Sequence, residues 1–198
     1  MGVAHETFLK GHPIVISVLR VALLSLVVLL AGCAGIEPQV YANEKPALDL
    51  RTYFNGTLEG HGAFMDRGGE VKRRFVVTIK ATWTGSGDTL VGTLDEDFVW
   101  SDGEREKRVW TLKPDPTRGP GHWTGTAADV KGQAQGVVAG NTLNWRYTFM
   151  LKTKDGKSYD IAFDDWMYLI DDRVLLNRAV MRFWGFRVGE VLISFNRK

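Results

Sequence analysis

Residues 74–83 read RFVVTIKATW, and this run shows the alternation that decides the fold. Apolar side chains occupy every second position, at Phe75, Val77, Ile79, Ala81 and Trp83. Successive residues of a β-strand point to opposite faces of its sheet. This period of two therefore predicts a strand with one buried face and one solvated face.

Similar runs extend along the chain from Phe54, and short glycine-containing turns such as Ala139-Gly140-Asn141 separate them. No stretch after Phe54 shows the 3.6-residue period of a long amphipathic helix. We expect about ten strands, at residues 54–66, 70–83, 89–101, 104–113, 120–128, 130–138, 142–153, 157–169, 173–183 and 187–197. An antiparallel meander of this length usually closes or curls, because closure removes exposed edges. The sequence therefore predicts an all-β barrel, either closed or half-open.

The N-terminal stretch has the parts of a bacterial export signal in the right order. Lys10 and Arg20 supply positive charge, residues 21–30 are almost entirely apolar, and small residues surround the cysteine in Leu30-Ala31-Gly32-Cys33. This pattern resembles the lipobox of bacterial lipoproteins, in which the cysteine is acylated and the chain is cleaved just before it. The apolar run is shorter than the ~20 residues of a membrane-spanning helix, which favours a cleaved leader over a permanent anchor.

The lipobox defines the expected organisation of the chain. Residues 1–32 are predicted to be the signal peptide, 33–47 the lipidated Cys33 and a tether, and 48–198 the barrel domain, beginning with one helical turn. In lipoproteins of Gram-negative bacteria, a residue other than Asp after the acylated cysteine favours transfer to the outer membrane. Ala34 stands at that position. We therefore expect a lipid-anchored protein of the outer membrane that faces the periplasm.

Composition excludes several other classes of function. Without residues 1–32, the chain has 23 basic and 22 acidic side chains, which gives no reason to expect a nucleic-acid partner. Cys33 is the only cysteine, and the two histidines that remain, His61 and His122, lack metal-ligand spacing. No glycine-rich phosphate loop or nucleophile elbow is present. The sequence thus predicts no cofactor, metal site or catalytic residue, and it favours a binding protein over an enzyme.

Four polar side chains fall on the apolar faces of their strands, and a buried charge without a partner costs several kcal/mol. These residues should therefore contact one another or a ligand. They are Glu96, Arg108, Asp165 and Asn177. Together with four aromatic residues, they form the candidate binding site, in which the polar groups would meet the polar end of a ligand. The aromatic residues are Trp110, Trp145, Tyr147 and Phe163.

The loop between the third and fourth strands sets how Glu96 and Arg108 meet. A three-residue loop over 102–104 keeps the apolar faces of both strands on one side, whereas a two-residue loop would not. Glu96 then faces Trp110 and Arg108 faces Phe98, so the two charged residues become diagonal neighbours. Two interpretations stay open: a structural ion pair at one end of the barrel, or a polar patch that orients a ligand.

Several short elements together resemble one family of proteins. They are Glu96-x-Phe98, Asp102-Gly103, Arg108-x-Trp110, Asp129-Val130-x-Gly132, Gly140-Asn141, Asp164-Asp165-Trp166-Met167, Asn177-Arg178 and Gly185-Phe186-x-Val188-Gly189. Over most of residues 50–197 this pattern is similar to a group of proteobacterial lipoproteins of unknown function, and the Asp-Asp-Trp-Met element is its most specific part. The resemblance implies an envelope lipoprotein with a calycin-like, lipocalin-type barrel. It implies no activity.

These observations predict a barrel that binds a lipid-like or other apolar small molecule. One alternative is a lipid or lipoprotein transfer factor with a half-open barrel and an exposed hydrophobic loop. A second is an enzyme that modifies a lipid through the inward carboxyls of Glu96 and Asp165. A third is a filled barrel whose outer surface docks a partner. Basic residues near Arg67 and Arg187 are expected to be solvated, with contact to anionic lipid head groups as the alternative.

Overall fold

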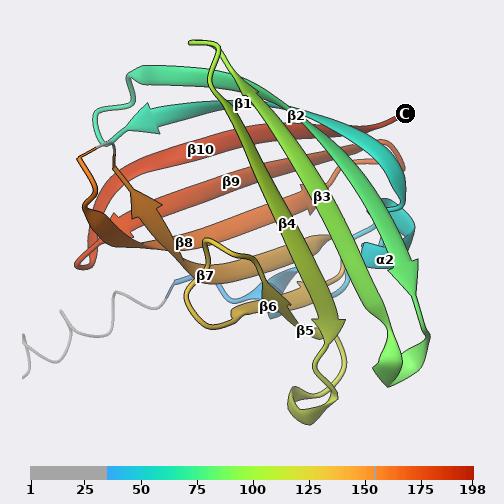
Figure 1. The fold of residues 1–198 in the computed structure, drawn as a ribbon. Helices are drawn as coiled ribbons and strands as arrows, with labels where there is room; N and C mark the ends of the chain where they lie inside the picture. The colour runs from blue at the N-terminus through green and yellow to red at the C-terminus, as the bar shows by residue number, and fades with distance from the viewer. Residues whose placement is uncertain (1–34, 154) are drawn as a thin grey trace, which may run out of the picture. The chain divides into compact units, whose positions relative to one another are not determined.

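The computed structural model describes residues 35–153 and 155–198. Ten antiparallel strands form a closed barrel in the order β1-β10-β9-β8-β7-β6-β5-β4-β3-β2 (Figure 1). Neighbouring strands are consecutive in the chain except β1 and β10, which pair to close the barrel. The predicted all-β meander is therefore confirmed. The predicted signal peptide and Cys33 lie outside the described residues.

The strands follow the expected spacing closely. They are β1 (Gly56–Asp66), β2 (Val71–Thr84), β3 (Val91–Trp100), β4 (Arg105–Pro114), β5 (His122–Thr126), β6 (Ala134–Ala139), β7 (Thr142–Lys152), β8 (Ser158–Leu169), β9 (Val174–Phe183) and β10 (Phe186–Arg197). Short helical elements are η2 (Pro38–Tyr41), α2 (Leu50–Tyr53), η3 (Gly87–Thr89) and η4 (Pro116–Arg118). In β2 the apolar positions Phe75, Val77, Ile79 and Ala81 are buried, and Trp83 is half-buried, as alternation requires.

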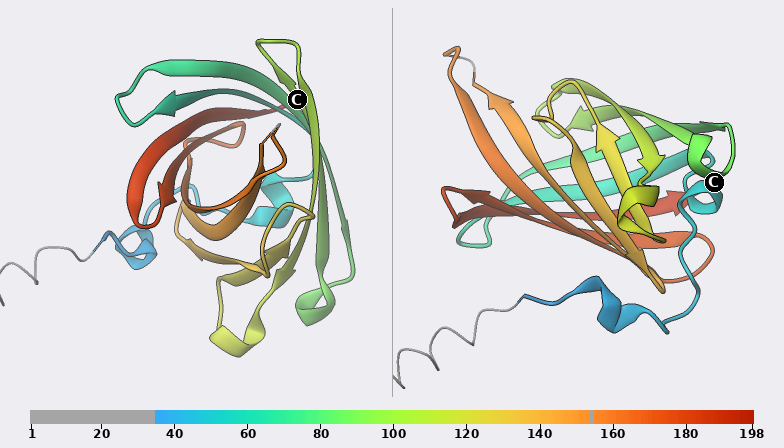
Figure 2. Two further views of the ribbon diagram at one scale, coloured as in Figure 1. Left: turned by 60° about the vertical axis from the view of Figure 1, so that its left-hand side comes forward. Right: turned by 90° about the horizontal axis from the view of Figure 1, so that it is seen from below.

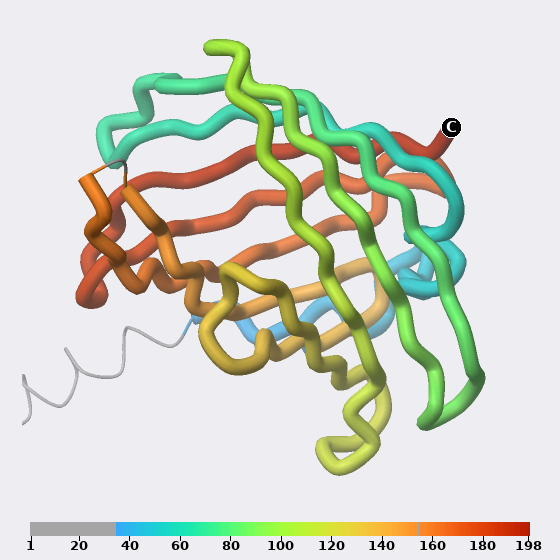
Figure 3. Tube along the Cα trace, in the orientation of Figure 1, coloured from blue at the N-terminus to red at the C-terminus, as the bar shows by residue number. Residues whose placement is uncertain are grey.

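The largest difference from the expected strands lies between β5 and β6, where residues 127–133 form a separate segment. Gly132 has a φ of 68°, a conformation that interrupts a regular strand. The segment instead hydrogen-bonds to β7, because the Met150 N–H donates to the Asp129 carbonyl and the Lys131 N–H to the Thr148 carbonyl. Figure 3 traces this segment between β4 and β7.

The short β5 leaves part of the barrel wall without a ladder. Pairing between β4 and β5 covers only Thr111–Pro114. Among the residues that the structure describes, the preceding part of β4, Arg105–Trp110, therefore has a strand partner on its β3 side alone. Residues 127–133 lie beside this part of β4.

The helix α2 closes one end of the barrel. Asp49 caps it, since its carboxylate accepts a hydrogen bond from the Thr52 N–H at 2.7 Å. Leu50, Tyr53 and Phe54 are at most 4 % exposed. The Tyr53 hydroxyl is within 3.1 Å of the carbonyl oxygens of two separate parts of the chain, at Arg173 and Phe195. Hydrogen bonds and apolar contacts thus join α2 to the barrel.

The segment expected to be a free tether packs on the barrel from Pro38 onward. The Tyr41 ring contacts Trp166 and Tyr168 edge-on, with centroid distances of 6.1 and 5.6 Å. The Tyr41 carbonyl also lies where a side chain at Gly140 would have to be, so the two backbones approach closely. Because Trp166 and Tyr168 alternate with inward residues of β8, this contact covers the outer face of the barrel.

The β1–β2, β7–β8 and β9–β10 turns lie at the other end of the barrel, away from α2 (Figures 1 and 2). This end has no counterpart of α2 within residues 35–153 and 155–198. It is called the mouth below.

Candidate functional site

The barrel interior contains a cavity of about 340 Å³. Small-molecule sites usually enclose about 300–1,000 Å³ and are mainly apolar with a few polar groups. Leu50 and Phe54 line its closed end, and residues near the mouth, such as Trp100 and Leu151, line the other. All eight predicted site residues line this cavity, namely Glu96, Arg108, Trp110, Trp145, Tyr147, Phe163, Asp165 and Asn177. Strand alternation brought them together, because each occupies an inward position.

Four aromatic rings form one continuous wall. Trp110 meets Trp145 and Tyr147 edge-on, at centroid distances of 5.8 and 5.3 Å, and Tyr147 stacks on Phe163 at 4.9 Å. Such arrangements stabilise aromatic pairs beyond the area that they bury. The Trp145 indole packs directly on the backbone of Gly125 in β5, where any side chain would overlap it. The glycine in this short strand therefore makes room for the ring.

The pairing of β3 with β4 differs from the predicted register by two residues. Glu96 lies directly opposite Arg108, not diagonal to it. The loop is Ser101-Asp102-Gly103, and the Gly103 N–H donates to the Trp100 carbonyl at 2.9 Å. Gly103 has a φ of 87°, which suits glycine at this turn position. A shift of two residues keeps every side chain on its predicted face, so both charged residues still point inward.

Arg108 does not form the expected ion pair with Glu96 in the described part of the chain. Its Nε donates to Asp129 Oδ2 at 2.8 Å, and its guanidinium lies 5.0 Å above the Phe149 ring. The Asp129 side chain is 33 % exposed, so an ion pair with it costs less desolvation than an ion pair with the buried Glu96. The ion pair joins the unpaired half of β4 to residues 127–133.

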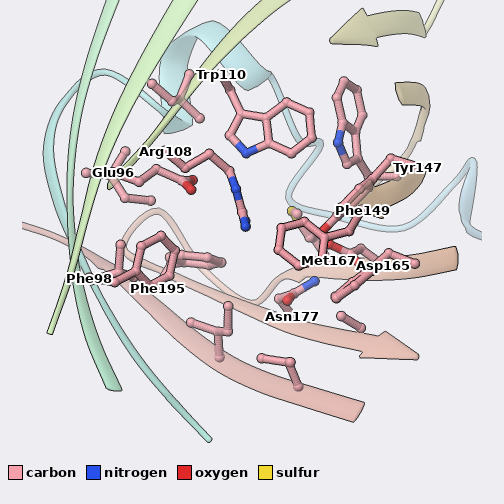
Figure 4. A pocket seen from close by; sticks show the side chains of 18 of the residues that line it. Glu96, Phe98, Arg108, Trp110, Tyr147, Phe149, Asp165, Met167, Asn177 and Phe195 are labelled. Carbon is pink, nitrogen blue, oxygen red and sulfur yellow. The ribbon is translucent and has the colours of Figure 1, made fainter. Parts of the chain in front are cut away.

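Figure 4 shows Arg108 reaching into the cavity beside Glu96, with Asp165 and Asn177 on the opposite side. Burial raises the pKa of Glu96 to about 7, although the positive charge of Arg108 opposes the shift. Burial likewise raises the pKa of Asp165 to about 8, again against Arg108, while the nearby Asp164 adds to the increase. Near neutral pH, both carboxyls are therefore protonated for a large part of the time.

Three polar atoms of cavity-lining residues have no hydrogen-bond partner among the described residues: Asp165 Oδ1, Trp100 Nε1 and Arg73 Nε. Of these, Arg73 Nε still lies 2.9 Å from Asp102 Oδ2 in an ion pair. Buried polar groups are nearly always hydrogen-bonded in folded proteins. Asn177 is also buried, and its amide donates to the Trp166 carbonyl at 3.4 Å. The unused atoms therefore indicate a place where a bound molecule would supply the missing partners.

Asp164 and Asp165 lie on opposite faces of β8, as alternation predicts. Asp164 faces outward, where Asn144 and Arg146 bind its carboxylate at 2.8 and 3.2 Å. Only Asp165 faces the cavity. Among the described residues, the cavity thus contains two buried carboxyls, Glu96 and Asp165, which could exchange protons with a bound molecule.

Sequence reasoning missed Asp129 as a site residue. It lies outside the named strands, so alternation could not assign it a face. The only signal was its place in the Asp129-Val130-x-Gly132 element. Phe149 and Trp100 were also missed, although both are in phase with inward residues of their own strands.

Residues 35–153 and 155–198 contain no group of three or more His, Cys, Asp or Glu side chains arranged to hold a metal ion. This part of the chain also has no helix long and apolar enough to cross a membrane.

The barrel is similar to that of the S-type phycobiliprotein lyase from Guillardia theta. The TM-score is 0.56 with 8 % identity, over 83 % of this chain and 98 % of that chain. It is also similar to a DUF3598-family protein of unknown function from Nostoc punctiforme PCC 73102. There the TM-score is 0.54 with 14 % identity, over 78 % of this chain and 51 % of that chain.

Similarities at such low identity show the fold alone, and they confirm a lipocalin-like barrel. No curated protein matches the chain in sequence. A family model described as protein of unknown function, DUF3833, matches residues 27–197, which is most of the chain. The chain therefore belongs to the DUF3833 family.

Proposed function

We propose that the barrel binds a lipid-like or similarly apolar small molecule through its interior. The observation that carries this proposal is the cavity of about 340 Å³ with a small polar cluster in a mainly apolar, aromatic wall. Protein interiors rarely keep voids much larger than a water molecule, so a filled, purely structural barrel would not leave such a space. The unused Asp165 Oδ1 adds a polar group that a ligand would satisfy.

The polar cluster favours a ligand whose polar end contains acceptor oxygens. Arg108 supplies N–H donors, and protonated Glu96 and Asp165 supply O–H donors. Burial also raises the pKa of Tyr147 well above its ordinary value, so its hydroxyl remains a donor. A cationic head group would be disfavoured by the charge of Arg108. A carboxyl, ester or hydroxyl group on an apolar body fits this combination of donors.

The location of this activity is part of the proposal. The lipobox sequence supports acylation of Cys33, which would keep the barrel at the outer membrane on its periplasmic side. Replacement of Cys33 by Ser should abolish acylation. The amount of acylated protein and its distribution among membrane fractions would test this. Acylated wild-type protein in the outer-membrane fraction is the expected result, and an unmodified wild-type Cys33 would contradict it.

Native mass spectrometry of the full chain, extracted from cell envelopes with mild detergent, tests the binding itself. We expect an additional mass on the wild type, identifiable as an apolar molecule after release. Ala179→Phe should remove it, because Ala179 lines the cavity and is 3 % exposed, so the larger ring would occupy the ligand's space. Arg178→Ala, one position away on the outward face, is the matched control and should keep the ligand.

A wild type without added mass that also fails to bind an apolar fluorescent probe would contradict the proposal. Equal retention by Ala179→Phe, with its fold confirmed by circular dichroism, would place the ligand outside the cavity.

A further inference from the structure

The β9–β10 turn places two aromatic side chains in solvent. Trp184 is 86 % exposed and Phe186 is 78 % exposed, more than any other large apolar residue that the structure describes. Phe183 pairs with Phe186, so Trp184 and Gly185 alone form the turn. Both residues have a positive φ, 50° for Trp184 and 83° for Gly185. Such a two-residue turn normally uses Asn-Gly or glycine pairs.

Trp184 is the one residue other than glycine with a positive φ in the described part of the chain. A bulky side chain in this conformation is strained, and exposure of its ring to water adds a further cost. Its ring stacks on Phe183 at 5.5 Å, a contact that leaves most of it exposed. A tryptophan at this position therefore does little to stabilise the fold, and the strain indicates an interaction outside the barrel.

The apolar surface of this turn continues into the neighbouring hairpin. Tyr159 of β8 meets Phe183 edge-on at 5.9 Å, and Leu151 of β7 pairs with Tyr159 in the ladder. Leu151 is 38 % exposed, yet it also lines the cavity. The apolar wall of the cavity thus extends without a break to the exposed tip, at the end away from α2 (Figure 1).

Basic side chains flank the aromatic tip. Arg182 and Arg187 face each other across the β9–β10 ladder, and their side chains are 41 % and 43 % exposed. Their acidic partners lie further back and are more buried: Asp164, 3.8 Å from Arg182, and Glu190, 3.0 Å from Arg187. The outermost groups of this hairpin are therefore aromatic rings and guanidinium groups.

We propose that this tip, residues 182–187, docks on the surface of an anionic lipid bilayer. Trp184 and Phe186 would enter the interfacial region, where amphipathic aromatic rings are favoured. Arg182 and Arg187 would contact anionic head groups. The chemistry favours a bilayer over a protein partner, because a protruding two-residue turn has no groove or flat face of its own. A fluid bilayer accepts such a turn without shape complementarity.

Docking would bring the mouth of the barrel to the lipid surface. Because Leu151 is exposed beside the tip and also lines the cavity, an apolar molecule could pass between bilayer and cavity along an apolar path. The docking proposal does not depend on the identity of the cavity's occupant.

Depth-dependent fluorescence quenching on the full chain tests the proposal. With Cys33→Ser, the substitution Val188→Cys provides the sole attachment point for an environment-sensitive fluorophore, and Trp184 and Phe186 remain. Ile170→Cys, in the β8–β9 turn and 52 % exposed, gives a matched control label. Vesicles of phosphatidylcholine, with and without phosphatidylglycerol, contain lipids with an interfacial nitroxide quencher.

On anionic vesicles we expect several-fold stronger quenching at position 188 than at position 170. Trp184→Ser with Phe186→Ser should remove this difference. Arg182→Gln with Arg187→Gln should weaken it on anionic vesicles only, whereas Arg51→Gln with Lys80→Gln, two exposed basic residues elsewhere, should not.

Equal quenching at both positions would overturn the proposal, as would quenching at 188 that survives both serine substitutions. A label at 188 that becomes shielded without vesicles, as protein concentration rises, would instead identify a second copy as the partner. Ala179→Phe should keep the docking signal even where it removes the cavity ligand. Failure of docking and failure of ligand binding are therefore distinguishable.

Discussion

The two ends of the barrel use the same residue types in opposite ways. At the closed end, Phe54 is 4 % exposed and its carbonyl accepts a hydrogen bond from the Trp83 indole. At the mouth, Trp184 and Phe186 are exposed and their turn is strained. Buried aromatic area stabilises the fold, whereas exposed aromatic area adds little to it. The closed end thus stabilises the barrel, and the mouth is the part free to serve binding.

A matched pair of phenylalanines gives the largest expected difference. Phe54→Ala removes a buried ring at the closed end and should lower the free energy of unfolding by about 3–5 kcal/mol. Phe186→Ala removes an exposed ring at the mouth and should change it by about 0.5 kcal/mol or less. Urea denaturation of both variants measures this difference. Similar losses for both would break the comparison between the two ends.

The cavity between the two ends should make stability depend on pH. Burial raises the pKa of Glu96 to about 7 and that of Asp165 to about 8, whereas both titrate near pH 4 in an unfolded chain. The folded state holds these protons more tightly, so the stability they contribute is complete below about pH 4 and is lost as the pH rises through about 7 to 8.

We therefore expect wild-type stability to fall by a few kcal/mol between about pH 5 and about pH 9, relative to Glu96→Gln with Asp165→Asn. Urea denaturation at a series of pH values measures the difference. If wild type and double variant showed parallel pH profiles, the two carboxyls would not be titrating in the folded barrel as their burial requires.

The Arg108–Asp129 ion pair should matter for the mouth half of the barrel more than for the closed end. Arg108→Met leaves Asp129 without its partner, and we expect a loss of roughly 1–3 kcal/mol. Asp129→Asn in the same chain should recover part of it. Amide hydrogen exchange should increase in Arg105–Trp110, which lack a ladder on one side, and stay unchanged in residues 77–81 of β2. Uniform loss of protection would show that the pair supports the whole barrel.

The smallest expected effect has the opposite sign. Trp184→Asn places a residue that tolerates positive φ in the turn, so stability should rise by about 0.5–1 kcal/mol. The same substitution should weaken quenching of the label at Val188 on anionic vesicles. Gain of stability with loss of docking would show that strain at the mouth serves an interaction. A loss of stability would instead show that Trp184 supports the fold.

The amino-acid sequence by itself determined the barrel and the residues that face its interior. Alternation with a period of two is a local property, readable from neighbouring residues such as Phe75 and Val77. It assigned each strand residue to a face, and closure of the meander then brought the inward residues together. For this reason the eight residues named from the sequence line one cavity, although they come from five different strands.

Only the tertiary structure decided register and partners. A shift of two residues leaves every face unchanged, so alternation could not distinguish Glu96 opposite Arg108 from Glu96 opposite Trp110. The partner of Arg108 comes from residues 127–133, where no strand periodicity applies. Tyr41 likewise packs on β8 through contacts distant in sequence. Such contacts depend on which surfaces meet when the barrel closes. Barrel closure is a property of the whole chain, so no local sequence pattern encodes these contacts.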